Sequence, residues 1–252
     1  MSVPEVRILG IPGIPIIVPG DDLVAIIYDA VTAADLSFED GDVLVVTQKI
    51  VSKAENCLIN LNDITPSPFA ESLAQQWGKD PRSVEVVLQQ SRRIAKMDRG
   101  LIIAETHHGF VCANAGVDQS NMDSDDIVAV LPPDPDGSAR ALRAGLKART
   151  GIDVAVIICD TFGRPWRSGI VNVALGLSGI EALQDYTGLR DAHGYELRVT
   201  ALCVADELSS AAELVMNKLD NVPVALIRGY PYPRGDGDRS RLVRDPDSDL
   251  FR

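Results

Sequence analysis

Three apolar runs of the chain end in acidic residues. The run CANAGVD ends at Asp118, the run VIICD ends at Asp160, and the run LCVAD ends at Asp206, which Glu207 follows. Open α/β sheets place their ligands at strand ends, where carboxylates from several strands can converge. Carboxylates and water suit Mg²⁺ or Mn²⁺, typically beside substrate phosphates, and Thr161 could add a hydroxyl oxygen. The pattern therefore predicts a divalent metal held by oxygen ligands.

Each of these carboxylates also has a purely structural explanation. Asp206 could cap the helix that follows it, with Glu207 at the positive end of the helix dipole. Asp118 could be a turn residue in VDQSN. The chain has only three histidines, and the HHG sequence at 107–109, between two strand-like runs, predicts a turn. A multi-histidine metal site is therefore excluded, and any metal must be held by oxygen.

Two groups of basic residues accompany the acidic ones. Lys49 and Lys53 follow a strand-like run and lie four residues apart, so on a helix they would share a face. Such a pair binds an anion or forms a solvated basic patch, because like charges on one face repel unless an anion lies between them. Arg164 and Arg167 lie on either side of Trp166 in DTFGRPWRSG. Guanidinium groups suit bidentate binding of carboxylate or phosphate, and Trp166 could stack on a planar ring or pack. A divalent metal ion and basic side chains in one site together favour phosphoryl transfer as the type of reaction.

These residues need a framework of strands and helices to position them. Runs rich in Val and Ile and bounded by Gly, Asp or Pro predict strands within 43–48, 100–105, 109–115, 153–160, 197–206 and 222–229. Capping patterns predict helices from Ser67-Pro68 to Gly78, from Asp80-Pro81 through SVEVVLQQSRRI, from Ser138 to Gly151, and over 207–218. The mixture predicts an α/β fold (mixed α+β), with mixed sheets and flanking helices.

Composition narrows the class of protein. The 252 residues carry 24 Lys plus Arg against 36 Asp plus Glu, a formal net charge of −12, and 46% are apolar. The charge argues against nucleic-acid binding, which needs a basic face, and no apolar stretch approaches the ~20 residues of a membrane span. The N-terminus lacks signal-peptide features, and four well-separated cysteines predict buried, reduced thiols. We expect a cytoplasmic protein with one catalytic domain over 1–252, which could be two-lobed, and a surface tail over 230–252.

Longer motifs carry a family resemblance. GIPIIVPGDDL, GDVLVVTQKIVSKAE, VCANAGVDQSN, DTFGRPWRSGIVNVALGLSGIEAL, VADELSSAAELV and LVRDPDSDLFR follow one another along the chain. With them the sequence resembles the coenzyme F420:L-glutamate ligase family over essentially its whole length, in the stand-alone form without a second domain. The resemblance implies an α/β fold that forms an interlocked homodimer.

The resemblance also implies a reaction. The family uses GTP to join L-glutamate to the terminal carboxylate of F420-0 or dehydro-F420-0, and adds further glutamates in γ-linkage. GDP and phosphate are released, two Mg²⁺ or Mn²⁺ ions are required, and K⁺ assists. A carboxylate is a poor acyl donor, and phosphorylation by GTP gives an acyl phosphate that the glutamate amine can attack. That chemistry needs metal and cations around the γ-phosphate.

The family motifs place individual roles on this chain. Metal ligands are implied at Asp118 and Asp160, with Thr161 beside the second ion and the remaining acidic ligand at Glu207 or Asp206. Nucleotide contacts are implied for the backbone of Gly13, Ile14, Pro15 and Ile16, for Gln48, Lys49 and Lys53, and for Asn121. Arg164 and Arg167 are assigned on chemistry alone to an anionic partner, either the deazaflavin phosphodiester or an incoming carboxylate, and with Asp160 they form the expected catalytic set.

The chain departs from many relatives in two places. Asn56 stands where a glycine is common, and asparagine tolerates the left-handed conformation that such a turn needs. The segment VMNKLDNVP lacks the glycine-rich stretch that helps to hold the nucleotide in some relatives. Two further hypotheses stay open: an amide ligase of the same mechanism that acts on another cofactor carboxylate, and a nucleotide- and metal-binding protein without turnover.

Overall fold

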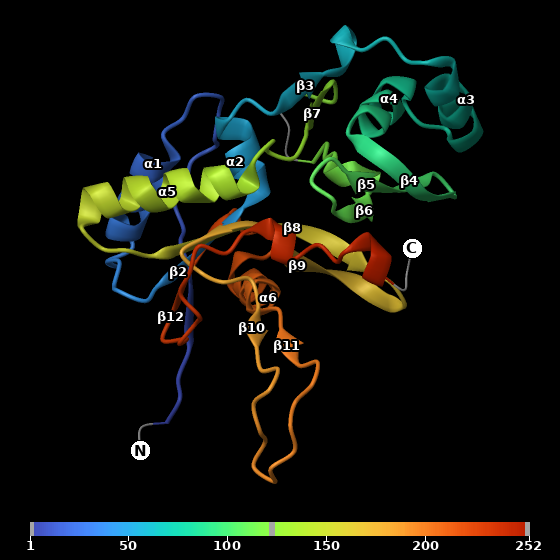
Figure 1. Ribbon diagram of the computed structural model, residues 1–252. Coiled ribbons are helices and arrows are strands. Elements are labelled where there is room, and N and C mark those ends of the chain that lie inside the picture. Colours follow the sequence, from blue (N-terminus) through green and yellow to red (C-terminus); the bar gives the residue numbers. More distant parts are fainter. Residues whose placement is uncertain (1–2, 121–123, 250–252) are drawn as a thin grey trace.

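A five-stranded mixed sheet forms the centre of the larger lobe (Figure 1). The computed structural model describes residues 3–120 and 124–249. Only β2 and β8 run parallel in this sheet, and the other neighbouring pairs are antiparallel. The strand order is β1 (Arg7–Gly10), β12 (Val224–Arg228), β2 (Val43–Thr47), β8 (Ala155–Arg164) and β9 (Arg167–Ser178).

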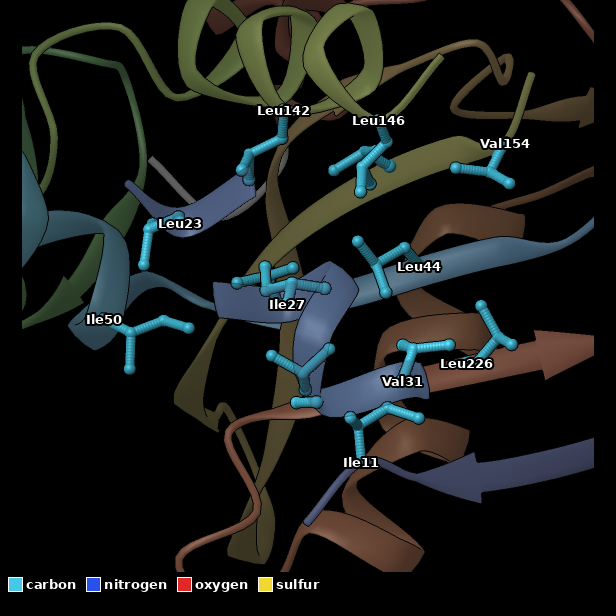
Figure 2. Packing of buried hydrophobic residues seen from close by; sticks show 14 of the residues in the cluster. Ile11, Leu23, Ile27, Val31, Leu44, Ile50, Leu142, Leu146, Val154 and Leu226 are labelled. Atoms are coloured by element: carbon cyan, nitrogen blue, oxygen red, sulfur yellow. The ribbon is translucent and has the colours of Figure 1, made fainter. Parts of the chain in front are cut away.

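Helices cover both faces of this sheet because its central strands are apolar on both sides. In β2, Leu44 and Val46 pack against α1 (Leu23–Ala33) and α5 (Pro135–Thr150), and Figure 2 shows Leu44 among the apolar residues of these two helices. Val43 and Val45 point to the opposite face, which α6 (Val204–Met216) covers. The short helix α2 (Gln48–Ala54) begins directly after β2. Because successive side chains point to opposite faces of a strand, β2 contributes to two separate hydrophobic cores.

The smaller lobe comprises residues 58–129 and has its own core. Its three-stranded antiparallel sheet has the order β4 (Ser91–Asp98), β5 (Leu101–Thr106), β6 (Val111–Ala113), and helices α3 (Pro68–Trp77) and α4 (Pro81–Gln89) pack on it. A second antiparallel pair joins β3 (Leu58–Asn60) to β7 (Ile127–Ala129). Short 3₁₀ turns η1 (Leu61–Asp63) and η2 (Asn114–Gly116) connect these elements. The prediction of an α/β fold with mixed sheets and flanking helices is confirmed.

Local capping signals predicted both ends of α3, the start of α4 and the end of α5 correctly. The Ser67 hydroxyl accepts a hydrogen bond from the Ala70 amide at the start of α3, and Gly78 ends that helix in the left-handed conformation. Asp80 caps α4, and Gly151 ends α5. Asn56 takes a φ of 57°, so it adopts the left-handed conformation that was expected of this turn.

Several predicted boundaries were wrong. Helix α4 ends at Gln89, and the SRRI sequence at 91–94 begins strand β4 instead. Helix α5 begins at Pro135, three residues before the predicted start. Of the strand predicted over 197–206, only β11 (Ala201–Leu202) forms, and α6 starts at Val204. Asp206 and Glu207 therefore lie in the first turn of a helix and not at the end of a strand.

Two segments extend beyond the layers of the sheet. β10 (Gln184–Asp185) pairs with β11, and the chain between them forms an arm, residues 186–200, that projects away from the rest of the molecule (Figure 1). The described part of the C-terminal tail lies on the surface, where the backbone amide and guanidinium of Arg239 bind the buried carboxylate of Asp136. It includes the 3₁₀ turns η3 (Arg239–Arg241) and η4 (Pro246–Ser248).

All four cysteines are free thiols, two of them buried, Cys112 and Cys159, and two partly buried, Cys57 and Cys203. Among the described residues, no helix combines the length and the apolar character that crossing a membrane requires.

Candidate active site

A cavity of about 990 Å³ is lined by residues of both lobes. The larger lobe contributes the N-terminal segment at 14–17, the start of α2, the end of β8 and the 217–223 connection between α6 and β12. The smaller lobe contributes β6, η2 and the residues that follow them. Segments that are far apart in the sequence thus meet at one site, as expected for a ligand-binding cavity.

The two carboxylates predicted as metal ligands meet in this cavity, one from each lobe. Asp160 lies on β8, and Asp118 follows η2. Burial, together with the negative charge of Asp118, raises the pKa of Asp160 to about 6, against the lowering effects of the Thr161 backbone amide and of the nearby lysines. The two carboxylates therefore lie close enough to influence each other, in a cavity wall that also carries lysine side chains.

Asp118 is held by an ion pair that crosses between the lobes. Lys49 Nζ lies 2.7 Å from Asp118 Oδ2 and donates to Ser120 Oγ at 2.6 Å. The Ser120 amide donates to Asp118 Oδ1 at 2.7 Å, so Asp118 is a turn residue as well as a cavity residue. Burial raises the pKa of Asp118, but the bonds from Lys49 and Ser120 outweigh it and hold the pKa below its ordinary value.

The helix α2 presents both predicted lysines to the cavity. Lys49 and Lys53 are one helical turn apart and both line it. Gln48, the third residue predicted from this segment, is 1% exposed, accepts a hydrogen bond from Ser52 Oγ at 2.7 Å and is not among the lining residues. The structure therefore gives the two lysines access to an anion and keeps the Gln48 side chain in the protein interior.

The N-terminal segment and η2 form further parts of the wall. Ile14, Pro15 and Ile16 line the cavity directly after Gly13, whose φ is +80°. In η2, three successive residues at 114–116 have φ between 51° and 73°. A Cβ at Gly116 would come within 2.8 Å of the Leu131 side chain, so glycine alone fits this left-handed turn.

The predicted arginine loop is the tip of a long hairpin. β8 continues past Asp160 to Arg164, and β9 begins at Arg167, so only two residues form the turn. Trp166 is 83% exposed with φ 58°, and Arg167 is exposed. Arg164 donates to the Ser168 carbonyl at 3.2 Å, and its Nε is buried without a partner among the described residues. Neither arginine lines the cavity, although Phe162 and Gly163, which directly precede Arg164 near the tip, do.

The remaining predicted residues lie elsewhere. Asp206 accepts a hydrogen bond from the Ala174 amide at 2.9 Å, burial raises its pKa, and Glu207 beside it is exposed. Neither residue lines the cavity, and about 16 Å of helix rise separates Asp206 from Asn217, which does. A metal-binding role for this pair stays a prediction that the arrangement within one chain does not favour. Asn121 falls outside the described residues.

Several polar residues of the cavity wall were not predicted, and three of them lie near Thr161 or next to a residue that does. Asn172 on β9 is 1% exposed and lies directly across the ladder from Thr161. Lys218 follows α6 and lies 3.2 Å from Glu213 Oε1, and its ammonium also reaches the Thr161 hydroxyl. Asn217 before it takes a φ of 49°. For Asn217 and Lys218 the sequence signal was the segment VMNKLDNVP, which departs from the expected glycine-rich pattern, and Asn172 had no such signal.

The donor set fits an oxygen-preferring divalent ion bound together with substrate. Asp118, Asp160 and Thr161 offer two carboxylates and a hydroxyl in one cavity. Within 3–120 and 124–249, no three His, Cys, Asp or Glu side chains gather closely enough to form a metal site by themselves. Mg²⁺ commonly binds through one or two carboxylates and completes its shell with water and substrate phosphates.

Comparison with known proteins identifies the family of this chain. Residues 13–229 match the family model F420-0:Gamma-glutamyl ligase. The chain is 45% identical over 250 residues to the coenzyme F420:L-glutamate ligase of Methanothermobacter thermautotrophicus, covering 98% of this chain and 99% of that protein. It is 46% identical over 256 residues to the enzyme of the same name from Methanopyrus kandleri, covering 100% and 99%. For that of Archaeoglobus fulgidus the identity is 39% over 250 residues, covering 98% and 97%. The chain belongs to the F420-0:gamma-glutamyl ligase family.

Proposed function

We propose that this protein uses GTP to add L-glutamate to the terminal carboxylate of F420-0, and then further glutamates in γ-linkage, through an acyl phosphate. Membership of the family makes it a ligase that adds glutamate to F420-0. The observation that supports the GTP-dependent mechanism is the meeting of Asp118, Asp160, Lys49 and Lys53 in one cavity. These groups come from three separate motifs and match the needs of phosphoryl transfer.

In this proposal the cavity binds the nucleotide triphosphate. Lys49 and Lys53 contact its phosphates from one face of α2, and the backbone at 13–16 contacts the nucleotide. Asp118, Asp160 and Thr161 would hold Mg²⁺ or Mn²⁺, which neutralises phosphate charge when bound. K⁺ and a second divalent ion, with Glu207 or Asp206 as ligand, remain parts of the proposal that come from the family resemblance.

The β8–β9 hairpin is proposed to meet the second substrate. It borders the cavity at Phe162 and Gly163, close to the tip that carries Arg164, Trp166 and Arg167. Two guanidinium groups beside an exposed indole suit a molecule that has both anionic groups and a planar ring. F420-0 and dehydro-F420-0 both offer a phosphodiester, a carboxylate and a deazaflavin ring. The exposed tip leaves these groups accessible to the acceptor.

A homodimer is part of the proposal. The arm at 186–200 projects from the body and carries exposed apolar side chains, among them Leu189, Tyr195 and Val199. Apolar side chains gathered on a projecting arm favour contact with another protein surface. Light scattering on the purified protein should give twice the mass of one chain, and a chain with the arm shortened should run as a monomer.

The activity is tested directly by mass spectrometry. The protein is incubated with F420-0, L-glutamate, GTP and Mn²⁺, and the deazaflavin products are weighed. Products heavier by one or more glutamate residues, absent without GTP or without metal, are expected, and Asp160→Ala should abolish them without unfolding the protein. GTP binding without any product would instead favour an amide ligase for another carboxylate. GTP hydrolysis that no acceptor stimulates, or no turnover at all, would contradict the proposal.

A further inference from the structure

Four side chains beside Asp160 form a closed ring of polar contacts. The Thr161 hydroxyl donates to Asn172 Oδ1 at 2.8 Å, and Asn172 Nδ2 donates to Glu213 Oε2 at 2.9 Å. Lys218 Nζ lies 3.2 Å from Glu213 Oε1 and donates to the Thr161 hydroxyl oxygen. Thr161, Asn172 and Lys218 line the cavity, whereas Glu213 supports them from α6.

The two charged groups of this ring, the Glu213 carboxylate and the Lys218 ammonium, fix the direction of every hydrogen bond in it. A carboxylate can only accept, so the amide of Asn172 must turn its nitrogen toward Glu213 and its oxygen toward Thr161. An ammonium can only donate, so the Thr161 oxygen must accept from Lys218. The single hydroxyl proton of Thr161 is therefore directed to Asn172 Oδ1. No other assignment satisfies all four groups.

The Thr161 hydroxyl oxygen therefore presents its lone pairs to cations, whereas its proton points toward Asn172. A hydroxyl has one proton and two lone pairs, and the ring uses the proton and one lone pair. Asn172 is rigidly placed for this task, since it is 1% exposed, lies opposite Thr161 in the β8–β9 ladder and has its backbone carbonyl bound by Ser210 Oγ at 2.8 Å.

We propose that Asn172 and Glu213 are positioning residues that orient the Thr161 hydroxyl as an acceptor for the divalent cation of the active site. The proposal rests on the proposed function, because it assumes that Thr161 and Asp160 face that cation. Neither Asn172 nor Glu213 contacts the ion itself. They act as the hydrogen-bonded partners of a ligand, whose loss typically weakens metal affinity 10- to 100-fold.

Exchanging the amide and the acid provides the sharpest test. In Asn172→Asp, two carboxylates face each other and the donor to Glu213 is lost. In Glu213→Gln, an amide that can also donate faces Asn172, so the direction of the bonds is no longer fixed. In the double variant N172D/E213Q, the glutamine amide can donate to the aspartate, which still accepts from Thr161, and the net charge equals that of the wild type.

Mn²⁺ binding to the protein with a saturating non-hydrolysable GTP analogue, measured by electron paramagnetic resonance and calorimetry against the analogue alone, is the readout. We expect each single variant to bind Mn²⁺ at least 10-fold more weakly than the wild type, and the double variant to return to within about threefold of it. Glu85→Gln is the matched control: Glu85 accepts from Ser67 Oγ at 2.6 Å in the smaller lobe, and its change should leave Mn²⁺ affinity unaltered. Thermal unfolding of each variant shows whether it is folded.

The outcomes separate this inference from the proposed function. If the wild type binds Mn²⁺, Asp160→Ala abolishes binding, and both single variants bind as the wild type does, the positioning role is overturned and the metal site stands. If the two losses simply add in the double variant, the inference is also overturned, because the directional argument requires rescue. If the wild type does not bind Mn²⁺ through Asp160, both the inference and the proposed metal site fail.

Discussion

Lys49 Nζ and Asp118 Oδ2 lie 2.7 Å apart, in an ion pair that joins the α2 helix of the larger lobe to the smaller lobe. Both residues line the cavity, and their opposite charges neutralise each other there. In the proposed reaction one contacts nucleotide phosphate and the other binds metal. Binding of the metal–nucleotide complex would therefore replace the Lys49–Asp118 ion pair by separate contacts of Lys49 with phosphate and of Asp118 with metal. These contacts would form where the two lobes meet.

Lys49→Met should separate binding from folding. The substitution removes a charge-assisted hydrogen bond to phosphate, worth about 1.5–3 kcal/mol, so the KM for GTP should rise roughly 10- to 100-fold. The lost pair is partly exposed and should cost at most about 1 kcal/mol of unfolding free energy. Steady-state kinetics and thermal unfolding measure the two effects. Lys96→Met, on the exposed face of β4, is the control, and an unchanged KM for GTP in Lys49→Met would contradict the assignment.

Asp160→Asn should make the metal-free protein more stable while abolishing turnover. The pKa of Asp160 is raised to about 6 in the folded chain, against about 3.9 for an unfolded aspartate. Because the folded state then holds the proton more tightly, ionisation destabilises it. That destabilisation is absent below about pH 4, grows as the pH rises to about 6, and stays constant above that at about 2–3 kcal/mol.

The check is a set of denaturation curves in the presence of a chelator at several pH values. An asparagine side chain does not ionise, so the Asp160→Asn variant should be more stable than the wild type at about pH 8, and the difference should vanish toward about pH 4. A difference that does not depend on pH would show that the pKa of Asp160 is not raised in the folded protein.

Trp166→Ala should impair substrate use without weakening the fold. The side chain is 83% exposed at the hairpin tip, and exposed substitutions away from special features usually change stability by less than about 0.5 kcal/mol. If the indole stacks on the planar ring of the acceptor, at roughly 1–3 kcal/mol per stacked base-like ring, kcat/KM for F420-0 should fall roughly 10-fold while the KM for GTP stays constant. Phe69→Ala, an exposed aromatic residue on α3, is the control. An equal fall for both substrates would argue against the acceptor role.

The sequence predicted the structure best where that structure depends on residues close together along the chain. The caps of α3 follow from Ser67 and Gly78 alone, and the buried strands follow from unbroken Val and Ile runs. It was misleading over 197–206, where an apolar pattern predicted a strand. A strand also needs a hydrogen-bonding partner, and much of this segment belongs to the projecting arm, so only Ala201 and Leu202 pair.

The residues of the candidate site likewise divide into those that the sequence predicted and those that it missed. Asp118, Asp160 and Lys49 were found because their motifs are long and their residue types indicate the chemistry. Asn172 and Lys218 were missed because a polar residue inside a strand and a lysine after a helix have no distinctive pattern. Their role arises from tertiary contacts, namely the β8–β9 register and the approach of α6 to β9. Strand β9 itself was not predicted, since glycines and an asparagine interrupt the apolar pattern of RSGIVNVALGLS.

Asn217 offers a test of backbone strain at the cavity. Its φ of 49° and ψ of 178° lie close to a region that essentially only glycine occupies, where strain costs about 1–3 kcal/mol. Its side chain donates to Asp220 Oδ2 at 2.8 Å on the surface, a bond that offsets part of this cost. Asn217→Gly should relieve the strain, lose that bond and gain entropy in the unfolded chain, for a net stabilisation of about 0.5–1 kcal/mol.

Asn217→Ala should do the opposite, because it keeps the strain and loses the bond, and we expect it to be about 1 kcal/mol less stable than the wild type. Urea denaturation of the three proteins gives the order directly. If the glycine variant were the least stable of the three, the segment would be held by its side-chain contacts and not limited by its backbone. The absence of a glycine-rich stretch would then reflect a different local conformation.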